Sequence, residues 1–274
     1  MYKILCSTGA LIGRPNGRDI RLLDSCLENL TCDGFEFMMY STWYDTLPEI
    51  LLYLRSLPTV FPVLHCEKGI GERISRGEEG DLPEALDAFS KNCEIAGEIG
   101  ADKLVLHLWS GIASDQHFER NLDTCGKLME IAEKYGVLLT VENVVCNTFD
   151  PMTRLIELTA AYPDLHFTYD TKMAQFHNQI PLLYVPENRG VLERIAHLHI
   201  NDYRGGYMDW GSLRTLHMGD GQIDFAAFLP FMKKNGYTGD FTIEATSFDG
   251  EGVIHFDALN RTFDRLRKAW EAIE

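Results

Sequence analysis

Eight short apolar runs recur along the 274-residue chain, and most are separated by longer stretches with helical spacing. The runs cover residues 2–8, 34–40, 60–67, 103–108, 138–143, 166–170, 195–202 and 240–245. They are continuously apolar rather than alternating, as strands covered on both faces are. Strands that alternate with helices indicate parallel βαβ units, and eight such units indicate a closed barrel. We therefore predict an α/β protein in which residues 1–274 form a single (β/α)8 TIM barrel domain.

The stretches between these runs carry the residues that start and stop helices. Residues 82–99 follow Asp81, a favourable N-cap residue, carry Pro83 in the first turn and end before Gly100. Similar patterns predict helices over residues 115–135, 151–161, 225–235 and 256–273. Two other stretches, 68–80 and 203–221, are predicted to be long loops after strands. Long structured loops at that face of a barrel are usually active-site lids.

The charge balance is strongly acidic, because 41 Asp and Glu against 25 Lys and Arg give a formal net charge of −16. Such a surface repels phosphate backbones and anionic membranes, so neither nucleic acid nor membrane is an expected partner. Neutral substrates are the easier assumption, although a local basic cluster could still hold one phosphate. No apolar run approaches the roughly 20 residues of a membrane span. The N-terminal residues are interpreted as the first strand and not as a signal peptide. A cytoplasmic protein with reduced cysteines is therefore expected.

Acidic or imidazole side chains stand at the ends of four consecutive runs, the fifth to the eighth: Glu142, Asp170, His199 and Glu244. Because a parallel barrel gathers its strand ends around one mouth, these four are expected to converge there. Two Glu, one Asp and one His form a mostly oxygen ligand set that suits one divalent metal ion, Mn, Zn, Co or Mg. Asn143 is a candidate to orient Glu142. The alternative is a hydrogen-bonded polar network that closes the barrel without a metal.

Other polar and aromatic side chains near the same mouth are candidates for binding substrate. They are His65, His107, Trp109, Lys172, Asp202, Arg204 and His217. His65 and His107 end the third and fourth runs, and Trp109 offers a face for stacking on a sugar or cyclitol. Each candidate also has a structural interpretation, such as a satisfied core histidine, rim packing, charge balance or a plain turn. The predicted position at the mouth favours substrate contact.

Six segments together resemble one known superfamily. They are LHLW, VEN, YDTKMAQ, HLHIND, LHMGDGQIDF and FTIEA, and they are similar to the xylose isomerase-like TIM barrels over essentially the whole chain. This superfamily includes sugar phosphate isomerases and epimerases, inosose isomerases and dehydratases, hydroxypyruvate isomerase, ketose 3-epimerases and AP endonuclease family 2. In the isomerase and epimerase branches, one divalent ion is held by Glu, Asp, His and Glu from strands five to eight. The resemblance implies this role for Glu142, Asp170, His199 and Glu244, and its nearest likeness is to the inosose isomerase type.

The activity implied is isomerisation or epimerisation of a small polyhydroxy carbonyl compound, namely a sugar, a sugar phosphate or an inosose. A metal ion would act as a Lewis acid, and Glu142 and Glu244 would be catalytic, one removing a proton beside the carbonyl and the other returning it. A metal-dependent lyase, either a dehydratase of the inosose type or a C-glycoside-cleaving enzyme, would share the first steps. A non-catalytic sugar-binding barrel is a further alternative, and a homo-oligomer is compatible with every interpretation. An AP endonuclease is disfavoured by the charge and by Met173, because a trinuclear zinc site needs a His there.

Overall fold

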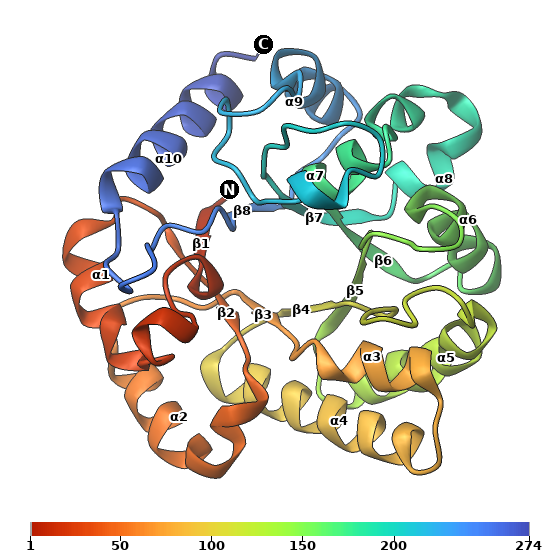
Figure 1. Ribbon diagram of the computed structural model, residues 1–274, viewed down its shortest axis with the longest axis horizontal. Coiled ribbons are helices and arrows are strands. Elements are labelled where there is room, and N and C mark those ends of the chain that lie inside the picture. The colour runs from red at the N-terminus through yellow and green to blue at the C-terminus, as the bar shows by residue number, and fades with distance from the viewer. Residues whose placement is uncertain (1, 274) are drawn as a thin grey trace.

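The computed structural model describes residues 2–273 as a closed barrel of eight parallel strands inside a ring of helices (Figure 1). The strands are β1 (Ile4–Ser7), β2 (Gly34–Met38), β3 (Val63–His65), β4 (Lys103–Leu106), β5 (Leu138–Glu142), β6 (His166–Asp170), β7 (Ile195–His199) and β8 (Asp240–Ile243). Each strand pairs with the next along the chain, and β8 pairs with β1. The predicted (β/α)8 barrel is confirmed, while the assignment of residues 1–274 to a single domain stays a prediction.

Every predicted run contains one strand, but most of the strands are shorter than the runs. The ladder of β3 ends at His65 and that of β7 ends at His199, although Cys66 and Asn201 beyond them are still buried. The chain therefore turns out of the barrel before it leaves the protein interior. An apolar run marks burial, which extends beyond the hydrogen-bonded strand.

The helices fill the outer layer and follow the strands in order. They are α1 (Leu23–Asn29), α2 (Leu47–Ser56), α3 (Gly69–Arg76), α4 (Asp81–Ile99), α5 (Phe118–Lys134), α6 (Pro151–Ala161), α7 (Thr171–Phe176), α8 (Arg189–Leu192), α9 (Phe225–Lys234) and α10 (Phe256–Glu271). The predicted helices are present with ends shifted by up to three residues. The longest shift is at α5, because Asp115 does not start this helix. Its carboxylate instead accepts the backbone N–H groups of Asn147, Thr148 and Phe149 in the loop after β5.

The prediction of a loop over residues 68–80 is wrong, because this segment contains α3. Ile70 and Ile74 lie one helical turn apart and are both buried, which gives α3 an apolar stripe. Gly71 brings the helix close to the end of β4, since a Cβ there would lie 1.7 Å from the carbonyl oxygen of His107. The glycines that suggested a flexible loop thus include one that permits close packing. The other predicted loop, 203–221, has only a short 3-10 turn at Trp210–Ser212.

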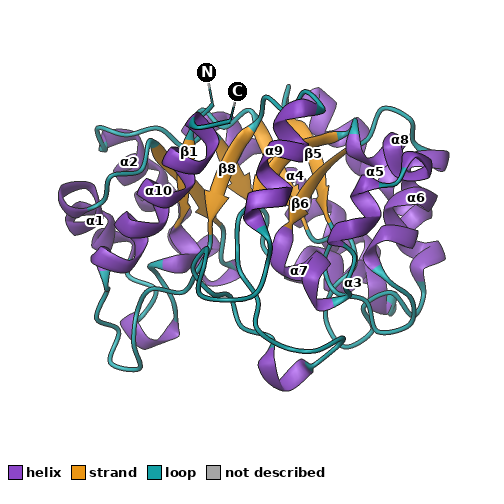
Figure 2. Cartoon of the chain, turned by 90° about the horizontal axis from the view of Figure 1, so that it is seen from above, coloured by secondary structure: helices purple, strands orange, loops and turns teal. Residues whose placement is uncertain are grey.

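All eight strands point toward one face of the barrel, and the long loops gather at that face (Figure 2). The carboxyl ends of the strands therefore surround one mouth, as the sequence predicts. Inside the barrel, polar side chains bond one another: the hydroxyls of Thr140 and Thr168 lie 2.7 Å apart, and His197 contacts Glu36 and Thr242. Between residues 2 and 273, no helix combines the length and the apolar character needed to cross a bilayer.

Candidate metal centre

The structure brings the four predicted ligands together at the mouth. Glu142, Asp170 and His199 are the last residues of β5, β6 and β7, and Glu244 directly follows β8. Each offers one ligand atom, and these four atoms all lie within 4.8 Å of one another. Glu142, Asp170 and His199 are fully buried, whereas the side chain of Glu244 keeps 15% of its surface exposed. The ligand set is therefore built on the ends of strands, which hold it rigidly.

Two asparagines fix the carboxylates in this arrangement. The amide nitrogen of Asn201 donates to Asp170 Oδ2 at 2.7 Å and to Glu244 Oε2 at 3.0 Å. Asn143 accepts from the backbone N–H of Asp170 at 2.6 Å and donates to its carbonyl oxygen at 3.1 Å. Asn143 thus positions Asp170 rather than Glu142, which corrects the expectation from sequence. The other oxygen of Asp170 accepts the backbone N–H of Met173 and caps α7.

Glu36 on β2 contacts the predicted ligand His199 from inside the barrel, and sequence reasoning missed it. His199 Nε2 lies 3.1 Å from Glu36 Oε2, whereas His199 Nδ1 lies 3.2 Å from both Glu142 Oε1 and Glu244 Oε2. The Nε2–H therefore donates to Glu36, and Nδ1 is the nitrogen that faces the ligand carboxylates. Carboxylates commonly orient metal-binding histidines in this way. The available signal was one acid inside the apolar run 34–40, since a buried carboxylate needs a partner.

Charges are tightly coupled in this cluster. Burial opposes ionisation of Glu142 and Glu244, but the neighbouring imidazoles outweigh it and hold the pKa of Glu142 well below its usual range and that of Glu244 at about 2. Burial lowers the pKa of His107 to about 4, so this ring is neutral at pH 7. His199 behaves oppositely, because Glu244, Glu36 and Glu142 outweigh its burial and raise its pKa well above 6.5. In the metal-free protein, His199 is therefore the cation that offsets these carboxylates.

Two observations show that the residues fit a divalent cation. Burial raises the pKa of Asp170 to about 6, and the nearby charges of Glu142 and Glu244 add to this effect against the opposing charge of Lys172, so a bound cation would favour the ionised carboxylate. Glu142 Oε2 is buried and finds no hydrogen-bond donor within residues 2–273, although His107 Nε2 lies only 2.6 Å away. A complete hydrogen-bonded network, the alternative interpretation, would leave no such oxygen unpaired. Three carboxylates and one imidazole are instead the donors that a divalent ion prefers.

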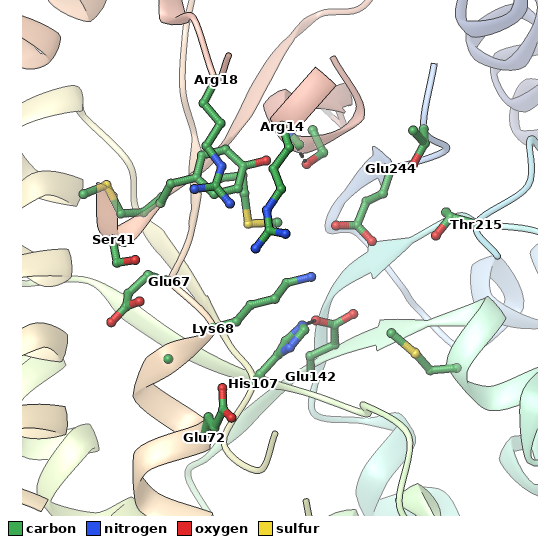
Figure 3. A pocket seen from close by; sticks show the side chains of 18 of the residues that line it. Arg14, Arg18, Ser41, Glu67, Lys68, Glu72, His107, Glu142, Thr215 and Glu244 are labelled. Carbon is green, nitrogen blue, oxygen red and sulfur yellow. Dashed lines mark hydrogen bonds and ion pairs between the residues drawn. The ribbon is translucent and has the colours of Figure 1, made fainter. Parts of the chain in front are cut away.

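A cavity of about 570 Å³ opens beside these ligands at the mouth, a size suited to a small molecule. Of the four ligands, only Glu142 and Glu244 line it. The predicted substrate residues His107 and Lys172 also line it, and the ammonium of Lys172 donates to Thr215 Oγ1 at 3.0 Å. Figure 3 shows Glu142 and His107 side by side, and Glu244 also points into the cavity.

Two other predicted substrate residues lie behind the cavity wall. His65 is buried, with Nδ1 2.9 Å from the carbonyl oxygen of Cys66 and Nε2 3.4 Å from Glu142 Oε2. It therefore belongs to the buried surroundings of Glu142 and is not among the residues that line the cavity. The prediction that Trp109 contacts substrate is wrong, because this indole is fully buried. Its N–H donates to the carbonyl oxygen of Val144 at 3.2 Å, and its ring packs edge-on against Phe118.

The three predicted residues of the β7–α9 segment organise their own loops instead of lining the cavity. The buried carboxylate of Asp202 accepts four backbone N–H groups, those of Tyr203, Gly219, Gly221 and Ile223. Arg204 donates to the carbonyl oxygen of Asp220 and borders a separate surface depression. His217 Nδ1 lies 3.0 Å from Thr262 Oγ1, so its ring joins the loop to α10. These contacts support the structural interpretation of all three residues in place of the predicted contact with substrate.

Three cationic residues at the cavity, Arg14, Arg18 and Lys68, were also missed. The available signal was their position in the segments that follow the first and third predicted runs, where a parallel barrel places loops at its mouth.

Comparisons with known proteins agree with this architecture. A family model described as xylose isomerase-like TIM barrel matches residues 31–269. An uncharacterized protein of Methanocaldococcus jannaschii, MJ1311, is 28% identical over 229 residues, which cover 77% of this chain and 74% of that protein. Among solved structures, a D-tagatose 3-epimerase-like protein has a TM-score of 0.73 at 19% identity and covers 99% of this chain and 98% of its own. The IOLI protein with a bound zinc atom has a TM-score of 0.72 at 16% identity, with 99% of both chains covered. Because the family model spans most of the sequence, this chain belongs to the xylose isomerase-like TIM barrel family.

Proposed function

We propose that this protein is a divalent-metal-dependent isomerase or epimerase of a small polyhydroxy carbonyl compound. The observation that carries the proposal is that Glu142 and Glu244 belong to the ligand set and also line the cavity, whereas Asp170 and His199 do not line it. The two carboxylates come from strands separated by β6 and β7, so they approach a bound molecule from different sides. Such a pair suits removal of a proton on one side and its return on another.

The chain's own residues supply most of this chemistry. A bound divalent ion would act as a Lewis acid that makes the C–H beside a carbonyl more acidic. Glu142 and Glu244 are ionised at pH 7, so either can accept that proton. The imidazole of His107 lies beside Glu142, with Nε2 2.6 Å from Oε2, and the ammonium of Lys172 faces the cavity to stabilise a negative substrate oxygen. Return of the proton to the same carbon inverts the configuration of that carbon, which is epimerisation. Return of the proton to the next carbon isomerises the compound.

The similar structures support the same class of reaction. They include an L-ribulose 3-epimerase and a D-allulose 3-epimerase in complex with D-allulose, with TM-scores of 0.73 and 0.71. A carbohydrate or cyclitol is therefore the proposed substrate. A lyase is the second candidate, because the imidazole of His107 lines the cavity and can form a hydrogen bond to a departing hydroxyl or glycosyl group.

Solvent exchange tests the proposal directly. Protein loaded with Mn, Co, Zn or Mg is incubated in D2O with keto-sugars, inososes and sugar phosphates, and deuterium in recovered substrate and product is measured by NMR. We expect exchange with one of these compounds, and a loss of at least about 100-fold in Glu142→Gln and in Glu244→Gln. Metal content is measured for each variant, because both residues are also proposed ligands. Near wild-type exchange in either variant would refute the two-carboxylate assignment, and loss of water or of a glycosyl group would identify the lyase.

A further inference from the structure

Three cationic side chains point into the cavity without an acidic partner. Arg14 and Arg18 lie in the segment after β1, and Lys68 lies between β3 and α3 (Figure 3). In the part of the chain that the structure describes, none of the three lies within 4 Å of a carboxylate oxygen. Neighbouring arginines are paired: Arg73 lies 3.1 Å from Glu67 Oε1, and Arg76 lies 2.5 Å from Asp81 Oδ1. Unpaired cations that share one cavity are unexpected in a chain of net charge −16.

The position of Arg18 is fixed by its surroundings. Its backbone has φ +53°, a left-handed conformation that arginine rarely adopts, and its carbonyl oxygen accepts the indole N–H of Trp43 at 3.2 Å. The guanidinium stacks 4.6 Å from the centre of the Tyr40 ring and donates to Thr42 Oγ1 at 3.3 Å. Its Nε is buried and has no acceptor among residues 2–273. A guanidinium that is fixed in position and has unpaired N–H groups is preorganised to bind a ligand.

Charge balance of the metal centre does not explain these cations. Five cationic and four anionic side chains line the cavity, so a divalent ion, with the carboxylate of its further ligand Asp170, would leave a net charge of +2. The cations in this count are Arg14, Arg18, Lys68, Arg73 and Lys172, and the anions are Glu67, Glu72, Glu142 and Glu244. A lining of this sign attracts an anionic ligand and raises its local concentration. The local basic cluster that the sequence analysis allows for is therefore found at this cavity.

We propose that Arg14, Arg18 and Lys68 form an anion subsite that binds a phosphate monoester group of the substrate. The identity of the rest of the substrate rests on the proposed function, whereas the subsite does not depend on it. A phosphate monoester offers up to two negative charges and three free oxygens, which match three separate cations on two loops. A carboxylate offers one charge and two oxygens. Arginine forks also bind phosphate through paired hydrogen bonds. The subsite holds the phosphate while the reacting carbons lie at Glu142 and Glu244.

Titration with inorganic phosphate tests the subsite alone. Binding to the full-length protein is measured by calorimetry, both metal-loaded and after treatment with a chelator, with acetate as the carboxylate probe. We expect phosphate to bind in both states and at least about tenfold more tightly than acetate. Each of Arg14→Gln, Arg18→Gln and Lys68→Gln should weaken phosphate binding about tenfold. Arg21→Gln is the matched control, because Arg21 also stacks on a tyrosine, Tyr53, but does not line the cavity.

Several results would overturn the subsite. Phosphate binding that disappears with the metal and ignores the three substitutions would place the anion on the metal. If Arg21→Gln weakens phosphate binding equally, the effect is one of general electrostatics. If acetate binds as tightly as phosphate, the phosphate assignment is refuted. Lys68→Gln is the most informative variant if Arg18→Gln fails to fold, because Lys68 is exposed.

A kinetic comparison then separates this proposal from the proposed function. Deuterium exchange is measured for a ketose and for the same ketose carrying a terminal phosphate. We expect the wild type to prefer the phosphorylated compound at least about 100-fold in kcat/KM, and Lys68→Gln to reduce that preference about tenfold. Phosphate binding without exchange of either compound would sink the proposed function and leave the subsite standing. Equal exchange of both compounds, with no phosphate binding, would sink the subsite and leave the proposed function standing.

Discussion

Replacing Glu36 with glutamine tests whether a carboxylate inside the barrel sets the metal affinity of His199. The amide keeps the size of the side chain and one oxygen acceptor, but it removes the negative charge 3.1 Å from His199 Nε2. The neutral amide pulls less strongly on the Nε2–H, so His199 Nδ1 becomes a weaker donor to a metal ion. The same amide can also rotate and present its NH2 group to the ring, which would favour the wrong tautomer of His199.

The expected loss follows from this single contact. Removing the partner of a metal-binding histidine typically costs 10- to 100-fold in metal affinity, which corresponds to about 1.4–2.7 kcal/mol. Glu36 also contacts His197 Nε2 at 3.0 Å and accepts from Thr242 Oγ1 at 2.8 Å, so the variant retains two contacts that keep its side chain in place. We therefore expect a folded protein that binds metal 10- to 100-fold more weakly.

Metal affinity is measured by competition with a chromophoric chelator, and the tautomer of His199 is followed by 15N NMR. Glu67→Gln is the matched control, because it also removes a buried carboxylate from the mouth, but one whose ion pair is with Arg73. A metal Kd for Glu36→Gln within threefold of the wild type would show that Glu36 does not control His199. An equal loss in Glu67→Gln would show that the effect is one of general charge.

Metal affinity should rise with pH from 5 to above 7, because Asp170 and His199 must both lose a proton before a metal binds. The pKa of Asp170 is about 6, and that of His199 is raised well above 6.5. Calorimetry at pH 7 in buffers of different ionisation enthalpy should show proton release, and its absence would mean that His199 is neutral in the metal-free protein. Trp109→Phe should lower the free energy of unfolding by about 1–2 kcal/mol, through loss of the hydrogen bond to Val144, and should leave the substrate KM within twofold. A large rise in KM with unchanged Tm would restore Trp109 as a substrate contact. Asp202→Ala should lower the free energy of unfolding in urea by at least about 2 kcal/mol, because four backbone N–H groups lose their acceptor. An unchanged unfolding midpoint would contradict this structural role of Asp202.

The strand ends are what sequence reasoning predicts best. Glu142, Asp170, His199 and Glu244 each end an apolar run, and parallel strands leave the barrel on one face, so local pattern and chain topology together place them at one mouth. Glu36 escapes this logic, because it lies inside a run and its partner is 163 positions away in the chain. The apolar run around Glu36 indicates that it is buried, but nothing local identifies the histidine that it contacts.

Residues just beyond a strand are harder to place. Trp109 follows His107 by two positions, but β4 ends at Leu106, so the alternation of a strand no longer determines where its ring points. Arg18 depends on a left-handed backbone conformation and on contacts to Tyr40 and Trp43, which sequence alone does not supply. Loop conformation, which decides what lines the cavity, is set by tertiary contacts rather than by local propensity.

The contact between Glu36 and the two histidines of β7 also has a consequence for how the barrel assembles. Glu36 belongs to the first half of the chain, whereas His197, His199 and Thr242 belong to the second. The buried carboxylate of Glu36 therefore finds its partners only in the second half, and a desolvated charge lacking its partner is strongly unfavourable. A half-barrel intermediate must therefore keep this layer hydrated, and water leaves it only when β2 and β7 close around it. We therefore expect the polar layer around His199 to couple the two halves, so that they unfold in one cooperative transition.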